Sequence, residues 1–133
     1  MNYYLVKSEP QTFSWDGFVK VAITVWDGVR NYAARKHIRS MRTGDLVLFY
    51  HSGDEKSVMG ICKVVKEAYQ DPTTKEDWTA VDLKVESPLK HPVQLSAIRA
   101  KQELANIYLV RQGRLSVMPL QKAEFDLIVK MGS

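Results

Sequence analysis

Basic side chains are concentrated in one stretch of the chain that contains no carboxylate. No acidic residue occurs between Asp27 and Asp45. The basic residues of this stretch are Arg30, Arg35, Lys36, Arg39 and Arg42. Because a guanidinium group can hold a phosphate through two parallel hydrogen bonds, the stretch predicts a surface that lies along a nucleic-acid backbone. A solvated helix face without a ligand is the alternative interpretation.

Trp26 is the aromatic residue whose position most favours a binding role. It stands directly before Asp27 and Gly28, outside any periodic hydrophobic pattern. An indole in such a place can offer its flat face to a nucleic-acid base, and stacking of this kind contributes roughly 1–3 kcal/mol per base. Most other aromatic side chains are expected in the core. The residue type alone leaves a purely structural role for Trp26 open.

Polar residues end the first apolar stretch of the chain. Lys7, Ser8 and Glu9 follow a run of aromatic and aliphatic residues, and Pro10 then turns the chain. Strand ends at the mouth of a barrel are places where polar groups direct a ligand. An ordinary strand exit is the alternative, because proline stops a strand in any context.

No catalytic or metal-binding pattern is found in the sequence. The chain has no Walker loop, no G-x-S-x-G motif and no dinucleotide-binding fingerprint. Its three histidines, His37, His51 and His91, lack the spacing of metal ligands. Ser8 or Ser52 could pair with His51 as nucleophile and base, but no acid stands where it would orient the histidine. We therefore expect a protein that is not an enzyme and uses no metal or cofactor.

Hydrophobic periodicity and turn residues predict the elements that must position these side chains. Strands are expected at 3–8, 45–52, 57–67, 78–86 and 114–118. Helices are expected at 14–21 with Ser14 as cap, at 31–41, at 97–104 with Ser96 as cap, and at 121–130. Residues 23–29 are expected as a loop or short strand, and Gly60 as a bulge or a close backbone approach. This interspersed order is typical of an α+β fold, a closed or nearly closed mixed barrel with short helices outside.

Composition limits the class of protein. The chain has 133 residues, 45% of them hydrophobic and 26% charged, so we expect one globular domain over residues 1–133. The net charge of +4 permits a polyanionic partner without requiring one. Cys62 is the single cysteine, and its apolar neighbours favour a buried thiol. The sequence shows neither a signal peptide nor an apolar run of membrane-spanning length, so a cytoplasmic monomer without a membrane partner is expected.

Several blocks of the sequence together resemble one known family, the EVE domain. The blocks are YYLVKSEP (3–10), FSWD (13–16), WDGVRNYAA (26–34), GDLVLFYHS (44–52), GI (60–61), YQDP (69–72) and RLSVMPL (114–120). They follow one another over nearly the whole chain. The resemblance implies a PUA-like fold, a mixed β-barrel of about five to six strands with flanking short helices. It also implies kinship with ASCH and YTH domains, of which the YTH domains enclose a modified RNA base in an aromatic cage.

The resemblance also implies a ligand pocket and its residues. The residues concerned are Lys7, Ser8, Trp26, Asn31, Tyr50, His51, Ser52, Arg114 and Ser116. Trp26 would be a cage wall, and the amide of Asn31 would offer both a donor and an acceptor to a base edge. The family pattern identifies no second aromatic wall in this chain, and Trp78 is the candidate for it.

The sequence therefore predicts a non-catalytic module that binds nucleic acid, DNA or RNA, and reads a modified or flipped base in an aromatic and polar pocket. A sensor of a free nucleotide or related metabolite, using the same pocket, is the first alternative. An enzyme acting on a base or nucleotide is the second.

Overall fold

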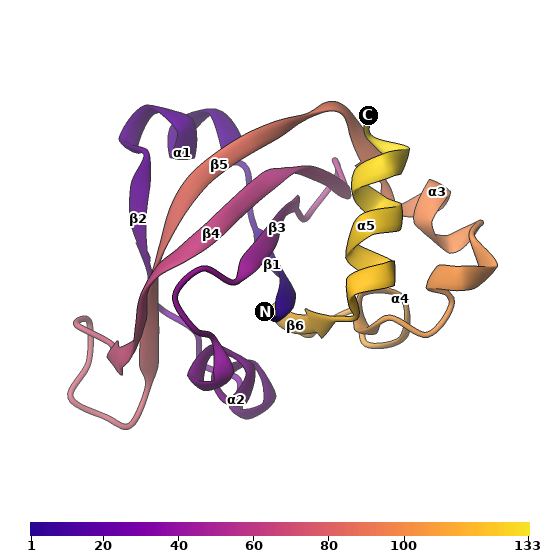
Figure 1. Cartoon of the computed structure of the whole chain (residues 1–133). Helices are drawn as coiled ribbons and strands as arrows, with labels where there is room; N and C mark the ends of the chain where they lie inside the picture. Colours follow the sequence, from indigo (N-terminus) through magenta and orange to yellow (C-terminus); the bar gives the residue numbers. More distant parts are fainter.

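The strands of the chain hydrogen-bond into one six-stranded sheet, in the order β2-β5-β4-β3-β1-β6. The computed structural model describes residues 1–133 (Figure 1). The strands are β1 (Tyr3–Ser8), β2 (Ile23–Trp26), β3 (Leu46–His51), β4 (Ser57–Gln70), β5 (Thr79–Gln94) and β6 (Val117–Leu120). The helices are α1 (Trp15–Val21), α2 (Tyr32–Ser40), α3 (Leu95–Arg99), α4 (Tyr108–Arg111) and α5 (Lys122–Met131), with a 3-10 turn at Gln102–Leu104.

One pair of neighbouring strands in the sheet is parallel. β1 runs parallel to β3 and antiparallel to β6, and β3 is followed by the antiparallel strands β4 and β5. A parallel pair needs a crossover connection, and α1, β2 and α2 all lie in the segment that supplies it. Residues 9–31, which include predicted site residues, therefore lie in the connection between β1 and β3.

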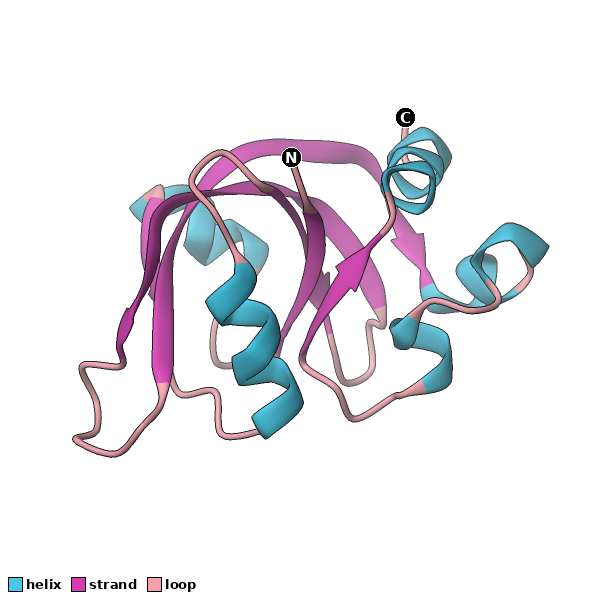
Figure 2. Ribbon diagram, turned by 60° about the horizontal axis from the view of Figure 1, so that its bottom comes forward, coloured by secondary structure: helices cyan, strands magenta, loops and turns pink.

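The long strands β4 and β5 bend the sheet. Their pairing shifts register at several places, including the step between Val58 and Gly60, and such bulges increase local twist. Figure 2 shows the sheet curling around the interior. β2 and β6 remain its two edges, so the barrel is nearly closed rather than closed. Helix α2 packs against β4, β5 and β6 and covers the gap. The predicted α+β mixed barrel of five to six strands with short helices is confirmed.

An aromatic cluster forms the part of the core nearest to α1. Phe49 lies 5.5 Å from Trp15 and 5.4 Å from Phe18, measured between ring centroids. Gly60 makes this packing possible, because a Cβ at residue 60 would collide with the benzene ring of Trp15. The close approach predicted at Gly60 is thus confirmed, and so is the bulge. Cys62 is fully buried, as expected, and burial raises the pKa of its thiol.

The early predictions match the structure well. β1 has the expected bounds, and Ser14 caps α1 by accepting a hydrogen bond from the backbone N–H of Gly17 at 3.0 Å. α2 lies within the predicted 31–41. His37 is half-buried, and its ring lies 6.0 Å from that of Tyr108. Burial and the charge of Lys36 lower the pKa of His37.

Several predictions for the second half of the chain were wrong. Ser96 is not a helix cap, because α3 begins at Leu95 and its N-cap, Gln94, makes no side-chain hydrogen bond. The predicted helix 97–104 is instead α3 followed by the separate 3-10 turn. β5 runs on to residue 94 through two prolines, beyond the predicted end at residue 86. The last strand is shifted to 117–120 and includes Pro119, which an edge strand tolerates. The four-residue helix α4 was not predicted.

No helix of the structure has the length and apolar character needed to cross a membrane. The helices α3, α4 and α5 gather at one end of the molecule, away from β2 and α1 (Figure 1).

Candidate functional site

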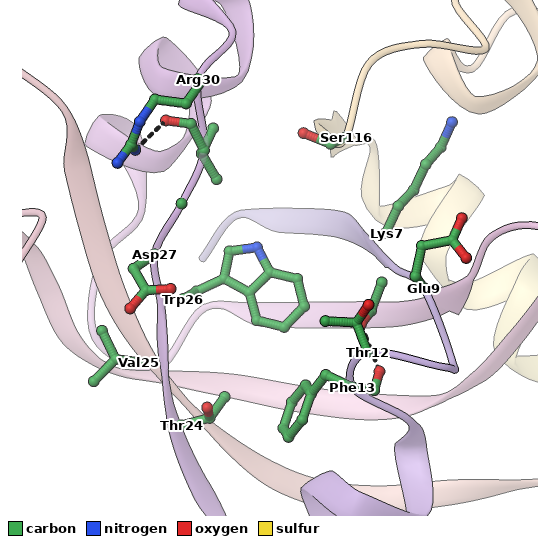
Figure 3. Close-up of a pocket in the computed structure, with 13 residues that line it drawn as sticks. Lys7, Glu9, Thr12, Phe13, Thr24, Val25, Trp26, Asp27, Arg30 and Ser116 are labelled. Atoms are coloured by element: carbon green, nitrogen blue, oxygen red, sulfur yellow. Dashed lines mark hydrogen bonds between the residues drawn. The ribbon is translucent and has the colours of Figure 1, made fainter. Parts of the chain in front are cut away.

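A cavity of about 480 Å³ opens where the ends of β1, β2 and β6 meet (Figure 3). This volume lies in the range of roughly 300–1,000 Å³ that is typical of small-ligand sites. Its lining includes Lys7, Ser8, Glu9, Thr12, Phe13, Thr24, Val25, Trp26, Asp27, Arg30 and Ser116. Aromatic surface and polar groups thus face one space, which suits a flat ligand with hydrogen-bonding edges.

The indole of Trp26 lies near the middle of this lining. Because side chains alternate along β2, Ile23 and Val25 face outward while Trp26 points inward. Its ring meets Phe13 at 6.5 Å and Phe49 at 5.8 Å, both edge to face. Figure 3 shows Lys7 and Ser116 on one side of the indole and Asp27 and Val25 on the other. The core therefore holds the ring in a fixed orientation while part of its surface remains open to the cavity.

Phe13 is the second aromatic ring of the cavity. It is inclined by 62° to Trp26, so the two rings form a corner rather than two parallel walls. Phe13 is held through its backbone carbonyl, which accepts a hydrogen bond from the Ser8 hydroxyl at 2.5 Å. Phe13 belongs to the FSWD block (13–16), but it was not among the predicted site residues. Trp78, the candidate for a second wall, does not line the cavity and stacks on Tyr32 instead.

Lys7 brings a cation to the opposite side of the cavity. Its Nζ donates a hydrogen bond to the carbonyl of Gly113 at 2.6 Å and lies 5.9 Å from the Tyr50 ring centroid. Burial lowers the pKa of Lys7 below its ordinary value. An ammonium group has three protons, so donation to a ligand remains possible beside the carbonyl contact. The backbone N–H of Lys7 also binds the carbonyl of Ser116 at 2.9 Å, which brings β1 and the start of β6 together here.

Asp71, which was not among the predicted site residues, organises the cavity wall. Its carboxylate is fully buried and accepts hydrogen bonds from the Gly28 N–H at 2.9 Å and from Arg30 Nη1 at 2.9 Å. Thr73 adds its backbone N–H at 2.7 Å and its hydroxyl at 2.5 Å. Burial by itself would raise the pKa of Asp71, but these hydrogen bonds outweigh it and hold the pKa below the ordinary value near 3.8. The segment between Trp26 and α2 is therefore tied to the end of β4.

Some residues of the basic stretch form ion pairs with carboxylates of the chain, and others do not. Arg30 binds Asp71 and also donates to the hydroxyl of Thr73 at 3.1 Å. Arg35 and Arg39 both reach Asp77 in the β4–β5 connection, at 3.5 and 2.5 Å. The Asp77 side chain is 78% exposed, so solvent weakens these two pairs. Lys36 and Arg42 form no ion pair. The arginines thus meet acidic residues that are distant in sequence.

Two of the predicted pocket residues are occupied by structural hydrogen bonds. Asn31 caps α2, its side-chain oxygen accepting from the Ala34 N–H at 2.9 Å. His51 is buried, and its Nε2 accepts from the backbone N–H of Trp15 at 2.9 Å, while Nδ1 faces Glu55 at 3.2 Å. Neither side chain lines the cavity. Both instead hold the helices that frame it.

The remaining predicted pocket residues fall into two groups. Ser8, Lys7, Trp26 and Ser116 line the cavity. Tyr50, Ser52 and Arg114 do not. Tyr50 is buried beneath Lys7, and burial raises the pKa of its phenol. The Ser52 hydroxyl donates a hydrogen bond at 3.2 Å to Glu9 of the lining without lining the cavity itself, and Arg114 is exposed on the loop before β6. The structure therefore brings together four of the nine residues that the family resemblance implied.

The EVE domain family matches residues 2–131. Human thymocyte nuclear protein 1 is 33% identical over 165 residues, covering 98% of this chain and 73% of the human protein. A solved structure of a Rhodopseudomonas palustris protein is 44% identical, with a TM-score of 0.94 over 99% of this chain and 93% of that one.

Two further structures bear on the site and the fold. Human THYN1, solved in complex with DNA containing 5-methylcytosine, is 32% identical with a TM-score of 0.93, over 100% of this chain and 98% of that one. An ASCH protein from Zymomonas mobilis is 15% identical with a TM-score of 0.65, over the full length of both chains. This second likeness concerns the fold alone and agrees with the expected PUA-like architecture.

Proposed function

The chain belongs to the EVE domain family, and from this membership we propose that it binds nucleic acid and takes one modified or flipped base into the Trp26 cavity, without catalysing a reaction. One observation carries the proposal. The Trp26 indole, fixed by Phe13 and Phe49, shares a cavity with the polar strand ends at Lys7 and Ser116. The human relative solved with DNA that contains 5-methylcytosine supports the nucleic-acid class of ligand.

The geometry supports a division of roles within the cavity. The indole offers a stacking face, and Phe13 closes a corner against the edge of the base. Lys7 is a donor and Asp27 an acceptor on different sides of the ring, so a base with both carbonyl and amino groups finds partners for each. A base extruded from a duplex loses its stacking on the neighbouring bases. Stacking on the Trp26 indole would offset part of that loss of free energy.

The experiment is a titration of oligonucleotides that differ only at one central cytosine, methylated or not, as single strands and as duplexes. We expect Trp26→Ala to weaken binding of the preferred probe by about 10-fold or more, because stacking of one base contributes roughly 1–3 kcal/mol. Trp26→Phe retains a smaller ring and should lose less. Val19→Ala, on the outer side of α1, serves as a control. A folded Trp26→Ala variant that loses no more than a few-fold in affinity contradicts the assignment of the base to this cavity.

A sensor of free nucleotides is the second candidate function. It is favoured by the finding that Arg30, Arg35 and Arg39 already bind carboxylates of the chain itself. Exchange of the unpaired Lys36 and Arg42 for glutamate separates the two functions. If nucleic acid is the ligand, oligonucleotide binding falls while mononucleotide binding is unchanged. If a free nucleotide is the ligand, neither changes.

The proposal that the protein is not an enzyme rests on the position of His51. Its ring is buried against the N-terminus of α1 and is absent from the cavity lining, so no serine–histidine pair faces the ligand space. Turnover of a nucleotide by the purified protein, lost in Trp26→Ala, would overturn this part of the proposal.

A further inference from the structure

An aromatic stack lies on the surface outside the cavity. Tyr32 begins α2 and Trp78 directly precedes β5, and their ring centroids are 5.3 Å apart with planes inclined by 29°. The Tyr32 residue is 71% exposed. One face of its ring is used by Trp78, and the exposure leaves the other face open to solvent.

Two arginines bind this stack. The Arg35 guanidinium lies 4.8 Å from the Tyr32 centroid and 5.0 Å from that of Trp78. It is oriented by a hydrogen bond of 2.7 Å to the carbonyl of Asp77. Arg30 lies 5.6 Å from the Trp78 centroid. The rings and guanidinium groups thus form one rigid surface built from α2 and the β4–β5 connection, which lie near each other in Figure 1.

Arg30 joins this surface to the cavity. Arg30 is one of the residues that line the cavity, and its guanidinium group, which lies over Trp78, is held in orientation by Asp71. The nucleotide next to a base bound in the cavity would therefore lie beyond Arg30, at the Tyr32–Trp78 stack. Lys36, one helical turn after Tyr32 on the same side of α2, provides an unpaired cation for its phosphate.

We propose that the Tyr32–Trp78 stack with Arg35 is a second nucleotide-binding surface, on which the base flanking the one in the cavity stacks. The inference rests on the proposed function and deepens it, because it assigns a place to a neighbouring nucleotide. Stacking on an aromatic ring tolerates any base, so this contact adds affinity for polynucleotides without adding sequence preference.

The test uses three probes, each prepared as DNA and as RNA. They are the 5-methylcytidine monophosphate, a pentanucleotide with 5-methylcytosine at its centre, and the same pentanucleotide with abasic residues on both sides of the centre. The abasic probe keeps the phosphates and removes the flanking bases, so it separates stacking from charge. We expect Tyr32→Ala to weaken binding of the normal pentanucleotide by about 10-fold, and to change binding of the other two probes by less than about 2-fold.

Controls address folding and ring chemistry. Tyr32→Phe retains the stack and should bind like the wild type. Tyr108→Ala removes a different exposed tyrosine, which lies outside the cavity lining, and should leave binding of all probes unchanged. Thermal melting verifies that each variant is folded. In NMR spectra, the normal pentanucleotide should shift the indole N–H signal of Trp78, and the monophosphate should not.

The outcomes distinguish this inference from the proposed function. If Tyr32→Ala binds the normal pentanucleotide like the wild type, or loses affinity equally for the abasic probe, the second surface is overturned while the cavity assignment stands. If Trp26→Ala leaves binding unchanged and Tyr32→Ala lowers it for the normal probe alone, the cavity assignment fails and the stacking surface stands. If the wild type binds none of the probes, both are overturned.

Discussion

Asp71 is the residue whose environment departs most from that of an ordinary surface carboxylate. It receives four hydrogen bonds, two of them from the segment that follows Trp26. A charged acceptor bound in this way stabilises the fold by more than a neutral hydrogen bond does. It also determines where Arg30 stands, because the guanidinium group is anchored to it. Loss of the Asp71 charge should therefore affect stability and ligand binding together.

We expect Asp71→Asn to lower the free energy of unfolding at neutral pH by about 1.5–3 kcal/mol. The pKa of Asp71 in the folded protein lies below its ordinary value near 3.8. Its contribution is thus fully present above about pH 4 and is lost as the pH falls through the lower pKa of the folded state. Chemical unfolding measured against pH should show a shallower loss of stability below about pH 4 in the variant than in the wild type.

Asp77→Asn is the matched control for this experiment, because Asp77 also binds arginine but is largely exposed. Its effect on stability should be clearly smaller. Equal effects of the two substitutions would show that burial of Asp71 does not strengthen its contacts.

At Gly60 the Trp15 ring packs so close to the backbone that a side chain at this position would collide with it. Gly60→Ala would place a methyl group on the Trp15 ring, which is itself buried and packed against Phe18 and Phe49. We expect a loss of about 1–3 kcal/mol of unfolding free energy, typical of overpacking, measured by denaturant titration. Gly113→Ala is the control, since a Cβ there meets no atom within 4 Å. A Gly60→Ala variant as stable as the Gly113→Ala variant would contradict the packing argument.

At the scale of elements, α2 connects the candidate site to the barrel. Its buried residues Ala34 and Ile38 face the sheet, while Tyr32 and Lys36 lie on the exposed side. Its first turn is stabilised by the Asn31 side chain rather than by a charged residue. The position of the stacking surface therefore depends on the N-cap of this helix.

Substitutions of Asn31 separate capping from ligand contact. Asn31→Ala should lower the unfolding free energy by about 1 kcal/mol, and Asn31→Asp should keep the stability, because a carboxylate also caps a helix. Aspartate lacks the amide donor that a base edge would use. If Asn31→Asp retains both stability and oligonucleotide affinity, capping is the role of this residue. If it is stable but binds several-fold more weakly, the amide contacts the ligand as the family resemblance implied.

At the scale of the whole molecule, the distribution of charge matters more than its sum. The net charge is +4, but three arginines of the basic stretch already face carboxylates of the chain. A nucleic-acid backbone at α2 and the turn after it would find Lys36 and Arg42 without ion-pair partners, and would compete with Asp77 for Arg35 and Arg39. Salt dependence measures how many of these cations contact phosphate.

For duplex DNA, we expect the logarithm of the binding constant to fall with the logarithm of salt concentration with a slope of about −3 to −4, which corresponds to about three to five neutralised phosphates. Exchange of Lys36 and Arg42 for glutamine should reduce the steepness by about 2. The double exchange of Lys90 and Lys101 changes the net charge equally at exposed positions outside α2 and should leave the slope as it was. Equal slopes for both double variants would contradict the assignment of α2 to the backbone.

Local patterns in the sequence were sufficient for much of the fold. The run of aromatic and aliphatic residues that stops at Pro10 identified β1, and Ser14 identified the start of α1, because both signals act over a few residues. The prediction of β5 ended too early, since proline within a strand is usually excluded but is accommodated here by irregular pairing with β4. The short helix α4 has too few residues to show helical periodicity.

For the candidate site, the sequence by itself indicated that Lys7 and Ser8 stand at a strand end, that Trp26 is the aromatic residue most suited to a binding role, and that the segment after Trp26 is rich in arginine. It did not show which side chains face the cavity. That depends on contacts between segments about forty residues apart, such as Gly28 with Asp71 and Trp15 with His51. Only the tertiary structure decided that His51 and Asn31 support helices, that Phe13 completes the corner beside Trp26, and that Trp78 lies outside. The physical reason is that periodicity reports burial along one element, whereas the hydrogen-bond partner of a polar side chain is set by how distant elements pack.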